Sequence, residues 1–446
     1  MIVQEQTITY HTVTLGTLTR EGNALAEIAV IQDQAGKNAE GEPHLLTLHV
    51  PAGLPGEVVT IGVEAPPLPR PGRQRRRWYP GSTRRSRPPR VWITEIHQPS
   101  PLRVQAPCPV FGTCGGCQLQ HMRYDAQLEW KRDVVRQLLR EIGNFEDPPV
   151  LATVPCDVPW HYRNHMRFSV NRSGQLGLTA RGTHRVLPLT SCPIAHEQIN
   201  RALQVLSQQV NAQPQALIRC GTATGQMLIQ PLQQPEVVQQ LADQGIDVRT
   251  ETMEEVLAGE TFRIRPSSFF QTNTAQAEKM VQMVREGLLG DSALPEEAAK
   301  CLTIVDAYCG VGTFALVLAR HVRKVIAIEE SASAIKDAQW NLREVNNVEI
   351  LKGKVEALLP ALAAQLDGLV IDPPRAGCQQ VVLDALVEHP VARIVYVSCD
   401  PSTLARDLHI LCHLHPIYRL RSVQPLDMFP QTAHIECIAV LERIDL

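Results

Sequence analysis

Three residues in the C-terminal part of the chain have the side chains needed for nucleophilic catalysis. Cys399 follows the apolar run RIVYVS, Asp372 ends the run DGLVID, and Glu436 stands between a polar turn and the apolar run CIAVL. Apolar runs of this length predict buried strands, and parallel strands present their carboxyl ends at one edge of a sheet, where open α/β folds bind ligands. A thiolate at that edge can attack a substrate, and a carboxylate can take a proton from it. We therefore expect Cys399 to be the nucleophile, Glu436 the general base and Asp372 a group that holds the substrate.

A second motif has the features of a nucleotide-type ligand site. In LTIVDAYCGVGTF an apolar run ends at Asp306, and the turn after it contains Gly310 and Gly312, which permit close approach of a ligand. The next run, KVIAIE, ends in Glu329, whose carboxylate can accept both hydroxyls of a ribose. These features fit a dinucleotide enzyme as well as a methyltransferase. The sequence D-P-P-R at 372–375 is typical of methyltransferases that act on nucleic acids and is not expected in a dehydrogenase.

A cysteine-rich loop lies near the middle of the N-terminal half. Cys108, Cys114 and Cys117 follow a C-x5-C-x2-C spacing in CPVFGTCGGC, and Cys192 is a candidate fourth ligand. Glycines in the loop let the backbone fold tightly, so that several thiolates can converge on one centre. Four thiolates can hold either a zinc ion or an iron–sulfur cluster, and the spacing alone does not decide between them.

The elements that must position these residues change in character along the chain, which predicts a multidomain protein. Residues 1–66 alternate apolar and polar positions between Gly and Pro turns, which predicts a small OB-like β-barrel. Residues 98–260 mix basic strands with helices and predict an α+β domain that includes the cysteine-rich loop. Residues 261–446 alternate short apolar runs with helices, as in a Rossmann-like α/β domain. We expect LTIVDA, KVIAIE, DGLVID and RIVYVS to form four successive parallel strands.

The segment 67–97 is predicted to be a linker with an RNA-binding role. From Arg70 to Arg90 it has nine arginines and no acidic residue, with Trp78 and Tyr79 available to stack on bases. The alternative is a solvated linker that binds nothing. The chain has no apolar run of the roughly 20 residues that a membrane span requires and no secretory signal pattern, so a cytoplasmic protein without membrane contact is expected. Nothing in the sequence indicates an obligate protein partner.

The candidate catalytic residues suit one reaction in particular, the methylation of uracil at C5. This carbon is a poor nucleophile, and a thiolate that adds to C6 activates it by building enolate character across C5 and O4. After C5 has taken the methyl group, a base must remove the C5 proton before the thiol can leave. The reaction needs one thiolate, one base and a polar group at the pyrimidine edge, which Cys399, Glu436 and Asp372 supply.

The chain resembles the RNA uracil-5-methyltransferase family in six segments that match in order and spacing: SFFQTN, DAYCGVGTF, VIAIE, IDPPRAG, VSCDP and DMFPQTAHIE. The residues around VPAGLPGEVV resemble a TRAM domain, and CPVFGTCGGCQLQH with the later CPI resembles the [4Fe–4S] segment of the bacterial 23S rRNA enzymes. The resemblance implies a catalytic pair, contacts to S-adenosylmethionine or the base, and cluster ligands. These are Cys399 and Glu436 for catalysis; Gln271, Tyr308, Glu329 and Asp372 for the contacts; and Cys108, Cys114, Cys117 and Cys192 for the cluster. One departure is Ala327, where the family pattern leads us to expect glycine.

Three alternatives remain open at this point. The first is the same chemistry on the T-loop uridine of tRNA, although the TRAM-like start and the cysteines favour 23S rRNA. The second is methylation of an exocyclic amine, which also uses D-P-P but needs no thiolate. The third is an RNA-binding protein with a decayed catalytic domain, which the intact Cys399 and Glu436 disfavour.

Overall fold

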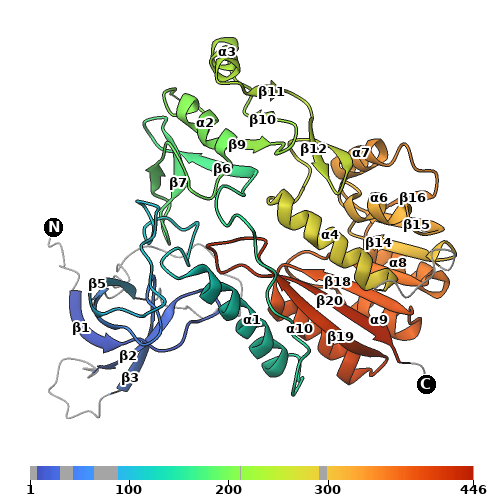
Figure 1. The fold of residues 1–446 in the computed structure, drawn as a ribbon, viewed down its shortest axis with the longest axis horizontal. Helices are drawn as coiled ribbons and strands as arrows, with labels where there is room; N and C mark the ends of the chain where they lie inside the picture. The colour runs from blue at the N-terminus through green and yellow to red at the C-terminus, as the bar shows by residue number, and fades with distance from the viewer. Residues whose placement is uncertain (1–7, 31–43, 65–88, 211, 291–298, 445–446) are drawn as a thin grey trace, which may run out of the picture. The chain divides into compact units, whose positions relative to one another are not determined.

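The computed structural model describes residues 8–30, 44–64, 89–210, 212–290 and 299–444, and Figure 1 shows the course of the chain. The chain divides into two compact units. The N-terminal unit contains the residues up to Gly112 and also Cys117–Arg123, and the C-terminal unit contains Thr113–Gly116 and Tyr124–Leu446. No helix in the described ranges combines the length and apolar character of a membrane span.

The described residues of the N-terminal unit form an all-β structure with five strands. They are β1 (Ile8–Thr14), β2 (Ala24–Val30), β3 (His44–Val50), β4 (Val58–Glu64) and β5 (Arg90–Gln98). β1, β4 and β5 form one antiparallel sheet, and β2 pairs with β3. Alternate residues of these strands, among them Ala24, Leu48 and Ile61, share one buried core. An all-β unit agrees with the expectation for residues 1–66, and the likeness to TRAM domains stays a resemblance.

The strand β5 differs from the prediction that residues 67–97 form a linker. Arg90–Gln98 pairs with β4 from Glu64↔Arg90 to Val58↔Gln98, so the C-terminal end of the predicted linker belongs to a sheet. The reason lies in the alternation of RVWITEI, whose residues Val91 and Ile93 pack against the core of the unit. Most of the Arg-rich run, including Arg75, Arg76 and Arg77, lies outside the described residues.

The first part of the C-terminal unit is an α+β region. The prediction of one α+β domain over residues 98–260 differs in its extent, because the residues up to Gly112 and Cys117–Arg123 belong to the N-terminal unit. Its six-stranded sheet has the order β11-β10-β9-β6-β7-β8, which is antiparallel except for the β10–β11 pair. Its strands are β6 (His165–Val170), β7 (Leu176–Thr179), β8 (Val186–Pro188), β9 (Gln215–Cys220), β10 (Gln226–Gln230) and β11 (Asp247–Arg249). The other elements are α1 (Tyr124–Glu141), α2 (Glu197–Leu206), α3 (Pro235–Asp243) and the hairpin β12 (Met253–Leu257) and β13 (Glu260–Ile264).

The second part is a seven-stranded sheet with the order β16-β15-β14-β17-β18-β20-β19. The strands are β14 (Thr303–Ala307), β15 (Lys324–Glu329), β16 (Val348–Lys352), β17 (Gly368–Ile371), β18 (Arg393–Ser398), β19 (Tyr418–Leu426) and β20 (Glu436–Arg443). The first five positions are parallel, and β20 is antiparallel to both β18 and β19. The four predicted parallel strands are confirmed as β14, β15, β17 and β18. The edge strand β16 was not predicted, because its sequence VEILK is only partly buried and lacks a continuous apolar run.

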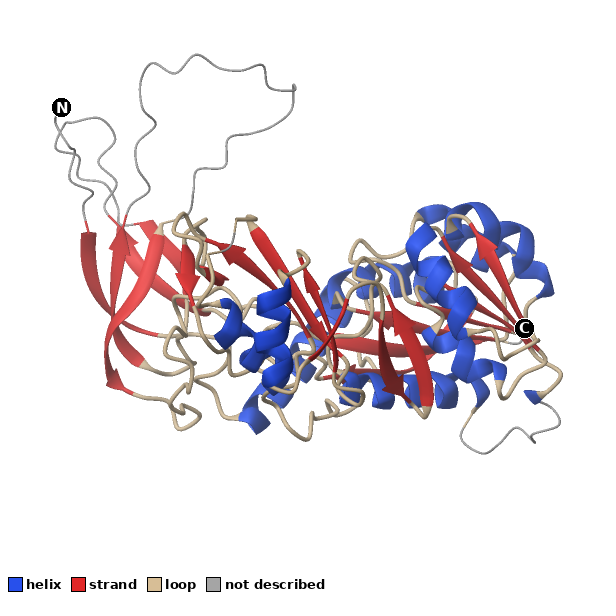
Figure 2. Cartoon of the chain, turned by 90° about the horizontal axis from the view of Figure 1, so that it is seen from above, coloured by secondary structure: helices blue, strands red, loops and turns tan. Residues whose placement is uncertain are grey.

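Helices cover both faces of this sheet (Figure 2). They are α4 (Thr274–Leu289), α6 (Thr313–Ala319), α7 (Ala332–Asn341), α8 (Val355–Leu362), α9 (Gln380–Glu388) and α10 (Pro401–His409), with a 3-10 turn at Ala363–Gln365 and a π turn at Ile410–Leu414. One core contains residues of α1, α8, α9 and α10 with Val305 and Ala307 of β14. The other contains residues of α4, α6 and α7 with Ile304. Successive residues of β14 thus face opposite sides of the sheet, and both sides are covered by helices. This explains why the sequence of the strand is almost continuously apolar.

The strand order reverses between β14 and β17, because the chain moves outward to β15 and β16 and then returns to the other side of β14. Open α/β sheets bind ligands outside the carboxyl ends of their strands at such a switch point. Tyr308 directly follows β14, and Asp372 directly follows β17. The topology therefore places the two predicted motifs at the same crevice.

Candidate active site

The pairing of β18 with β20 brings the predicted nucleophile and base together. The two strands run antiparallel, and their last paired residues are Ser398 and Cys437. The next residue along β18 is Cys399, and the residue before Cys437 is Glu436, so the two side chains stand at the same end of the pair. Asp372 follows Ile371, which pairs with Tyr396 of β18. The structure therefore gathers all three predicted catalytic residues at the carboxyl edge of the sheet.

The ionisable groups at this edge influence one another strongly. Burial raises the pKa of the Cys399 thiol to about 11, and the nearby Glu436 and Asp372 add to the rise. The carboxyl of Glu436, which is only 5% exposed, has a pKa well above its ordinary value because of burial and the charge of Asp372. Burial also raises the pKa of Asp372 to about 7. A thiol and two carboxyls compete here for negative charge, which is a pattern of catalytic rather than structural sites.

Arg375 is the cation that opposes this accumulation of negative charge. It lowers the pKa of Cys399 through its charge and a hydrogen bond, and its charge also lowers that of Glu436. From the sequence we expected Arg375 only as part of the D-P-P-R motif and gave it no separate role. The permanent charge of Arg375 could have revealed its role, because a thiol and two carboxyls that repel one another when ionised need a cation beside them.

The loop that carries Arg375 is anchored to the helix that follows Cys399. The buried carboxylate of Asp407 on α10 accepts hydrogen bonds from the Cys378 amide at 2.8 Å and from the Tyr396 hydroxyl at 2.7 Å. The Thr403 hydroxyl, on the same helix, donates to the Arg375 carbonyl at 3.2 Å. The positions of Cys399 and Arg375 are therefore fixed by one helix.

The turn after β14 has the geometry of a ligand cradle. Tyr308 lies in the left-handed region at φ 63°, as do Gly310 at φ 57° and Gly312 at φ 87°. A Cβ on Gly312 would lie 3.1 Å from a methyl carbon of Leu342, so the turn has little room for a larger residue. The Gly310 amide donates to Glu329 Oε2 at 2.9 Å, and the Tyr308 hydroxyl donates to Glu356 at 2.8 Å. The predicted residues Tyr308 and Glu329 are thus brought to one turn.

Ala327, the departure from the family pattern, does not displace Glu329. Its side chain is fully buried in β15, where it is opposite Asp306 of β14. The carboxylate of Glu329 accepts the Gly310 amide on one oxygen and the Ser331 amide, at 2.7 Å, on the other. Each oxygen keeps a further lone pair with which it can accept a ribose hydroxyl.

Asp306 is a site residue to which the sequence gave no role. It is fully buried, and its Oδ2 accepts the Ala315 amide at 2.8 Å, whereas Oδ1 has no hydrogen-bond partner among the described residues. Its pKa is raised to about 8 by burial and by the charges of Asp372 and Glu329. Asp306 thus adds a buried carboxyl that is close enough to Asp372 and Glu329 to interact with both charges.

Gln271 lies in a loop that is tied to the loop before Glu436. Its carbonyl accepts from the Asn164 side chain at 3.1 Å, and Asn273, two residues later, donates to the Met428 carbonyl at 3.1 Å. The structure therefore links the loop of Gln271 to the reacting edge. A contact of the Gln271 side chain with S-adenosylmethionine or the base stays a prediction.

The four candidate cluster ligands are distributed over both units. Cys108 and Cys117 belong to the N-terminal unit, and Cys114 and Cys192 belong to the C-terminal unit. Among the residues that the structure describes, no group of three or more His, Cys, Asp or Glu side chains is placed to hold a metal ion. The structure thus does not support the predicted [4Fe–4S] cluster.

Comparison with known proteins places this chain in a family. Residues 226–444 match the family described as tRNA (Uracil-5-)-methyltransferase. A protein of Gloeobacter violaceus named as an uncharacterized RNA methyltransferase is 37% identical over 79% of this chain and 85% of its own length. One of Halalkalibacterium halodurans with the same description is 34% identical over 78% of this chain and 86% of its own length.

The crystal structure of the Pyrococcus abyssi tRNA (uracil-54, C5)-methyltransferase, in complex with S-adenosyl-L-homocysteine, has a similar fold. It superposes with a TM-score of 0.67 at 24% identity and covers 96% of this chain and 99% of its own. The likeness extends the match from sequence to fold, so the α/β domain has a methyltransferase fold. This chain is a methyltransferase and belongs to the RNA uracil-5-methyltransferase family.

Proposed function

We propose that the enzyme transfers the methyl group of S-adenosylmethionine to C5 of a uridine in 23S rRNA, through a covalent bond between Cys399 and C6 of the base. The observation that carries this proposal is the adjacency of Cys399 and Glu436 at the end of the β18–β20 pair, with Asp372 and Arg375 beside them. A thiol and a buried carboxyl at the same end of a strand pair are the two groups that the C5 reaction requires.

The reaction begins when Cys399 loses its proton to solvent and its thiolate adds to C6. The C6–S bond forms as the C5–C6 double bond shifts its electrons toward C5 and O4. When bound, S-adenosylmethionine would supply an electrophilic methyl group. The C5–methyl bond would form as the bond between the methyl group and the sulfonium sulfur breaks, with S-adenosylhomocysteine as the leaving group. The Glu436 carboxylate then takes the C5 proton, the electrons of the C5–H bond restore the double bond, and Cys399 leaves as a thiolate.

The electrostatics of the edge fit the two roles. The thiol of Cys399 resists ionisation in the free protein, and the Arg375 guanidinium is the group that favours the thiolate. The raised pKa of Glu436 makes its carboxylate a stronger base than an exposed glutamate once it is ionised. Asp372, with a pKa of about 7, can act as acceptor or donor toward the pyrimidine edge.

The turn after β14 suits S-adenosylmethionine. Glu329 would accept the ribose hydroxyls, and Tyr308, Gln271 and Asp372 would make the remaining contacts. These residues bind and orient the ligand, and they take no part in the proton transfers.

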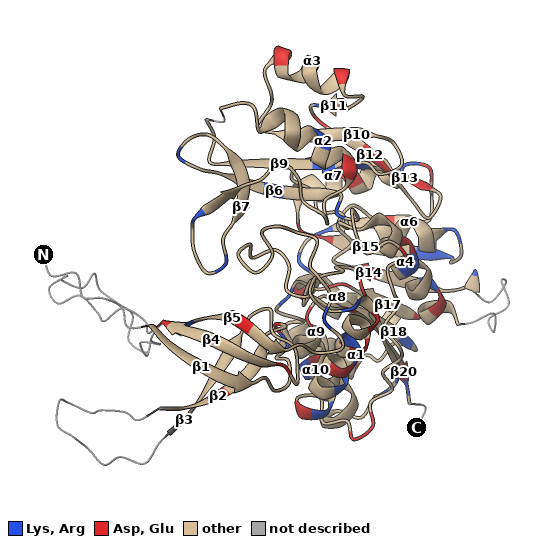
Figure 3. Ribbon diagram, turned by 60° about the vertical axis from the view of Figure 1, so that its left-hand side comes forward, with Lys and Arg blue, Asp and Glu red and all other residues tan. Residues whose placement is uncertain are grey.

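An RNA substrate is supported by the charge of the β6–β8 region. Residues 158–196 contain five arginines and no Asp or Glu. Arg172 and Arg185, in the turns that join these strands, are exposed, and the blue positions around β7 in Figure 3 show this charge. Exposed arginines without neighbouring acids can contact phosphates.

Two observations favour the same chemistry on tRNA as a second candidate. The matching family and the solved Pyrococcus abyssi protein are both named for tRNA. The TRAM-like start and the cysteine-rich loop favour 23S rRNA instead. Mapping 5-methyluridine in 23S rRNA and tRNA from cells with and without the gene decides between them, since loss of the nucleotide from tRNA alone would exclude the rRNA assignment.

The [4Fe–4S] cluster is proposed from the sequence alone, and no step of the reaction depends on it. Four thiolates from Cys108, Cys114, Cys117 and Cys192 would hold about four irons. Protein purified without oxygen should then be brown and contain that amount of iron, and replacing Cys114 by serine should remove it. A colourless protein with one stoichiometric zinc ion would contradict the proposal.

The enzymatic proposal is tested with labelled S-adenosylmethionine and uridine-containing RNA. The label should appear at C5 of uridine, and none should appear with Cys399→Ala. Label on an exocyclic amine, or full activity of the variant, would contradict the proposal.

A further inference from the structure

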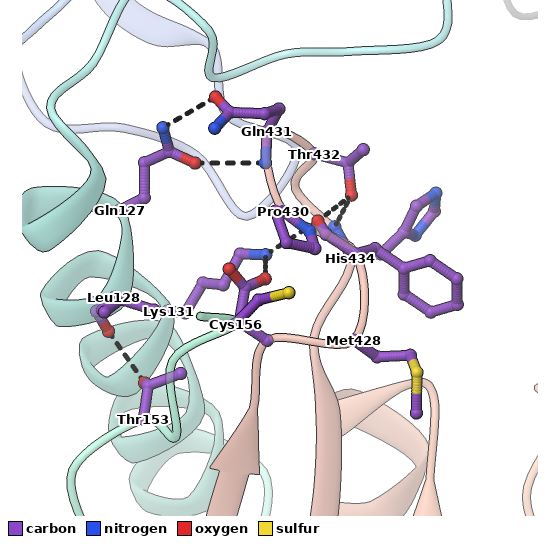
Figure 4. Close-up of polar contacts among 12 residues, drawn as sticks. Gln127, Leu128, Lys131, Thr153, Cys156, Met428, Pro430, Gln431, Thr432 and His434 are labelled. Atoms are coloured by element: carbon purple, nitrogen blue, oxygen red, sulfur yellow. Dashed lines mark hydrogen bonds and ion pairs between the residues drawn. The ribbon is translucent and has the colours of Figure 1, made fainter. Parts of the chain in front are cut away.

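The loop that ends at Glu436 is held by side chains from other segments. It joins Leu426, the last residue of β19, to Glu436, the first residue of β20, and these two residues are paired. Figure 4 shows that helix α1, more than 290 residues earlier in the chain, supplies several of these side chains. Tyr124, Gln127 and Lys131 are spaced by three and four residues, so they lie on one face of the helix.

The first contact is a completely buried ion pair. Lys131 Nζ lies 2.5 Å from Asp427 Oδ1, and both side chains are 0% exposed. The other oxygen of Asp427 accepts the Tyr124 hydroxyl at 2.7 Å, and Lys131 also donates to the Phe429 carbonyl at 3.2 Å. The pair thus fixes both a side chain and a backbone carbonyl of the loop.

The second contact is a reciprocal pair of amides. Gln127 donates from Nε2 to the side-chain oxygen Oε1 of Gln431 at 3.0 Å, and Oε1 of Gln127 accepts the backbone amide of Gln431 at 3.2 Å. Gln431 has φ 68°, a left-handed conformation that is strained for a residue other than glycine. The amide pair therefore holds the loop in a conformation that it would not favour alone.

Three further side chains bind carbonyls of the loop. Gln276 donates to Asp427, Asn273 to Met428 and Tyr162 to Pro430, at 3.0 to 3.1 Å. Each of the residues from Asp427 to Gln431 thus has a contact with another part of the C-terminal unit. Such a loop can hold one conformation and fix the direction from which Glu436 enters the site.

We infer that Lys131 is a positioning residue for the general base, acting through Asp427 and Phe429. This inference rests on the proposed function, in which Glu436 takes the C5 proton. Buried ion pairs are poor devices for stability, because desolvation offsets much of their attraction. They do fix geometry, because a charge displaced from its partner in an apolar interior is costly. Asp427 lies nine residues before Glu436, at the start of the same loop, so the geometry that this pair fixes is the position of the base.

The inference predicts a specific defect when Lys131 is replaced by methionine. Thiolate addition and methyl transfer do not involve Glu436, so both should proceed in a single turnover at close to the normal rate. Removal of the C5 proton should slow by about 10²-fold, as expected for a displaced catalytic group. The enzyme should then accumulate as a denaturation-resistant adduct with methylated RNA, as it should in Glu436→Gln.

Two other variants separate positioning from stability. Gln127→Met removes the amide pair without leaving a buried charge, and it should show a smaller accumulation of adduct even if Lys131→Met fails to fold. Tyr418→Phe is the matched control, since Tyr418 is buried at the opposite end of β19 and its hydroxyl donates to the Leu386 carbonyl at 3.3 Å. It should cause no accumulation.

The measured quantity is the ratio of adduct to released 5-methyluridine after one turnover. A raised ratio in Lys131→Met and Gln127→Met but not in Tyr418→Phe supports the inference. If the ratio in both variants equals that of Tyr418→Phe, the inference is overturned. It is also overturned if the variants lose methyl transfer and release of the methylated RNA to the same degree. If Glu436→Gln itself forms no adduct, the assignment of the base is wrong and the inference falls with it.

Discussion

The proposed active site has two halves at one edge of the same sheet, one around Glu329 and one around Glu436. The two carboxyl groups have opposite environments. In the turn after β14, both oxygens of Glu329 accept backbone amides, from Gly310 at 2.9 Å and Ser331 at 2.7 Å. At the reacting edge, no described residue lowers the pKa of Glu436 through a hydrogen bond; burial and Asp372 raise that pKa, and only the charge of Arg375 opposes them. Under the proposed function, the carboxylate that would accept ribose hydroxyls is supplied with donors, and the carboxylate that would take a proton is not. The difference separates a binding half from a reacting half.

Replacing the nucleophile should produce the largest effect. Cys399→Ser should reduce methylation by about 10³-fold or more, because a serine hydroxyl has no comparable anion to add to C6. Binding of S-adenosylmethionine, measured by calorimetry, should remain as in the unchanged enzyme, because the binding half is separate. Activity near normal would favour methylation of an exocyclic amine, and Cys399 would then have no separate reacting role.

The reacting half should also determine the pH dependence. The thiolate fraction of Cys399 rises with pH up to its pKa of about 11, and the ionised fraction of Glu436 rises in the same direction. Where addition of the thiolate limits the rate, ionisation of Cys399 alone should increase turnover by about tenfold per pH unit, or about a hundredfold between pH 6 and pH 8. A turnover rate that falls with rising pH would contradict the assignment of both groups.

The binding half should respond to loss of its carboxylate through affinity. Glu329→Ala should weaken binding of S-adenosylmethionine by ten- to a hundredfold, since a hydrogen bond to a charged group contributes about 1.5–3 kcal/mol. The rate at saturating ligand should recover. Glu330→Ala removes the exposed neighbouring carboxylate and serves as the control, which should bind normally. A low rate of Glu329→Ala at saturation would assign Glu329 to the reacting half instead.

The smallest effect is expected at Arg375, which assists the thiolate without bonding to the substrate carbon. Arg375→Met should raise the pKa of Cys399 and slow adduct formation by about tenfold at neutral pH. Raising the pH should restore much of the rate. Arg419→Met, which removes an exposed arginine of β19, is the control. A defect that persists at high pH would indicate that Arg375 binds RNA or substrate rather than tuning the thiol.

The sequence was sufficient to predict the strands that carry Asp372 and Cys399, because each is a continuous apolar run followed by a polar motif. It could not predict that Cys399 and Glu436 are adjacent, because the antiparallel return of β20 beside β18 depends on pairing between distant segments. Lys131 was missed for a related reason. A lysine in an amphipathic helix is expected to be solvated, and its partner Asp427 lies 296 residues away.

The separation of methyl transfer from proton removal is tested most directly by Glu436→Gln. After incubation with RNA and S-adenosylmethionine labelled in the methyl group, the denatured protein should remain attached to RNA through Cys399 and carry the label. Digestion and mass spectrometry should then find a 5-methylated uridine bonded to the peptide that contains Cys399. Normal turnover of Glu436→Gln with no adduct would show that another residue is the base and would contradict the proposed mechanism.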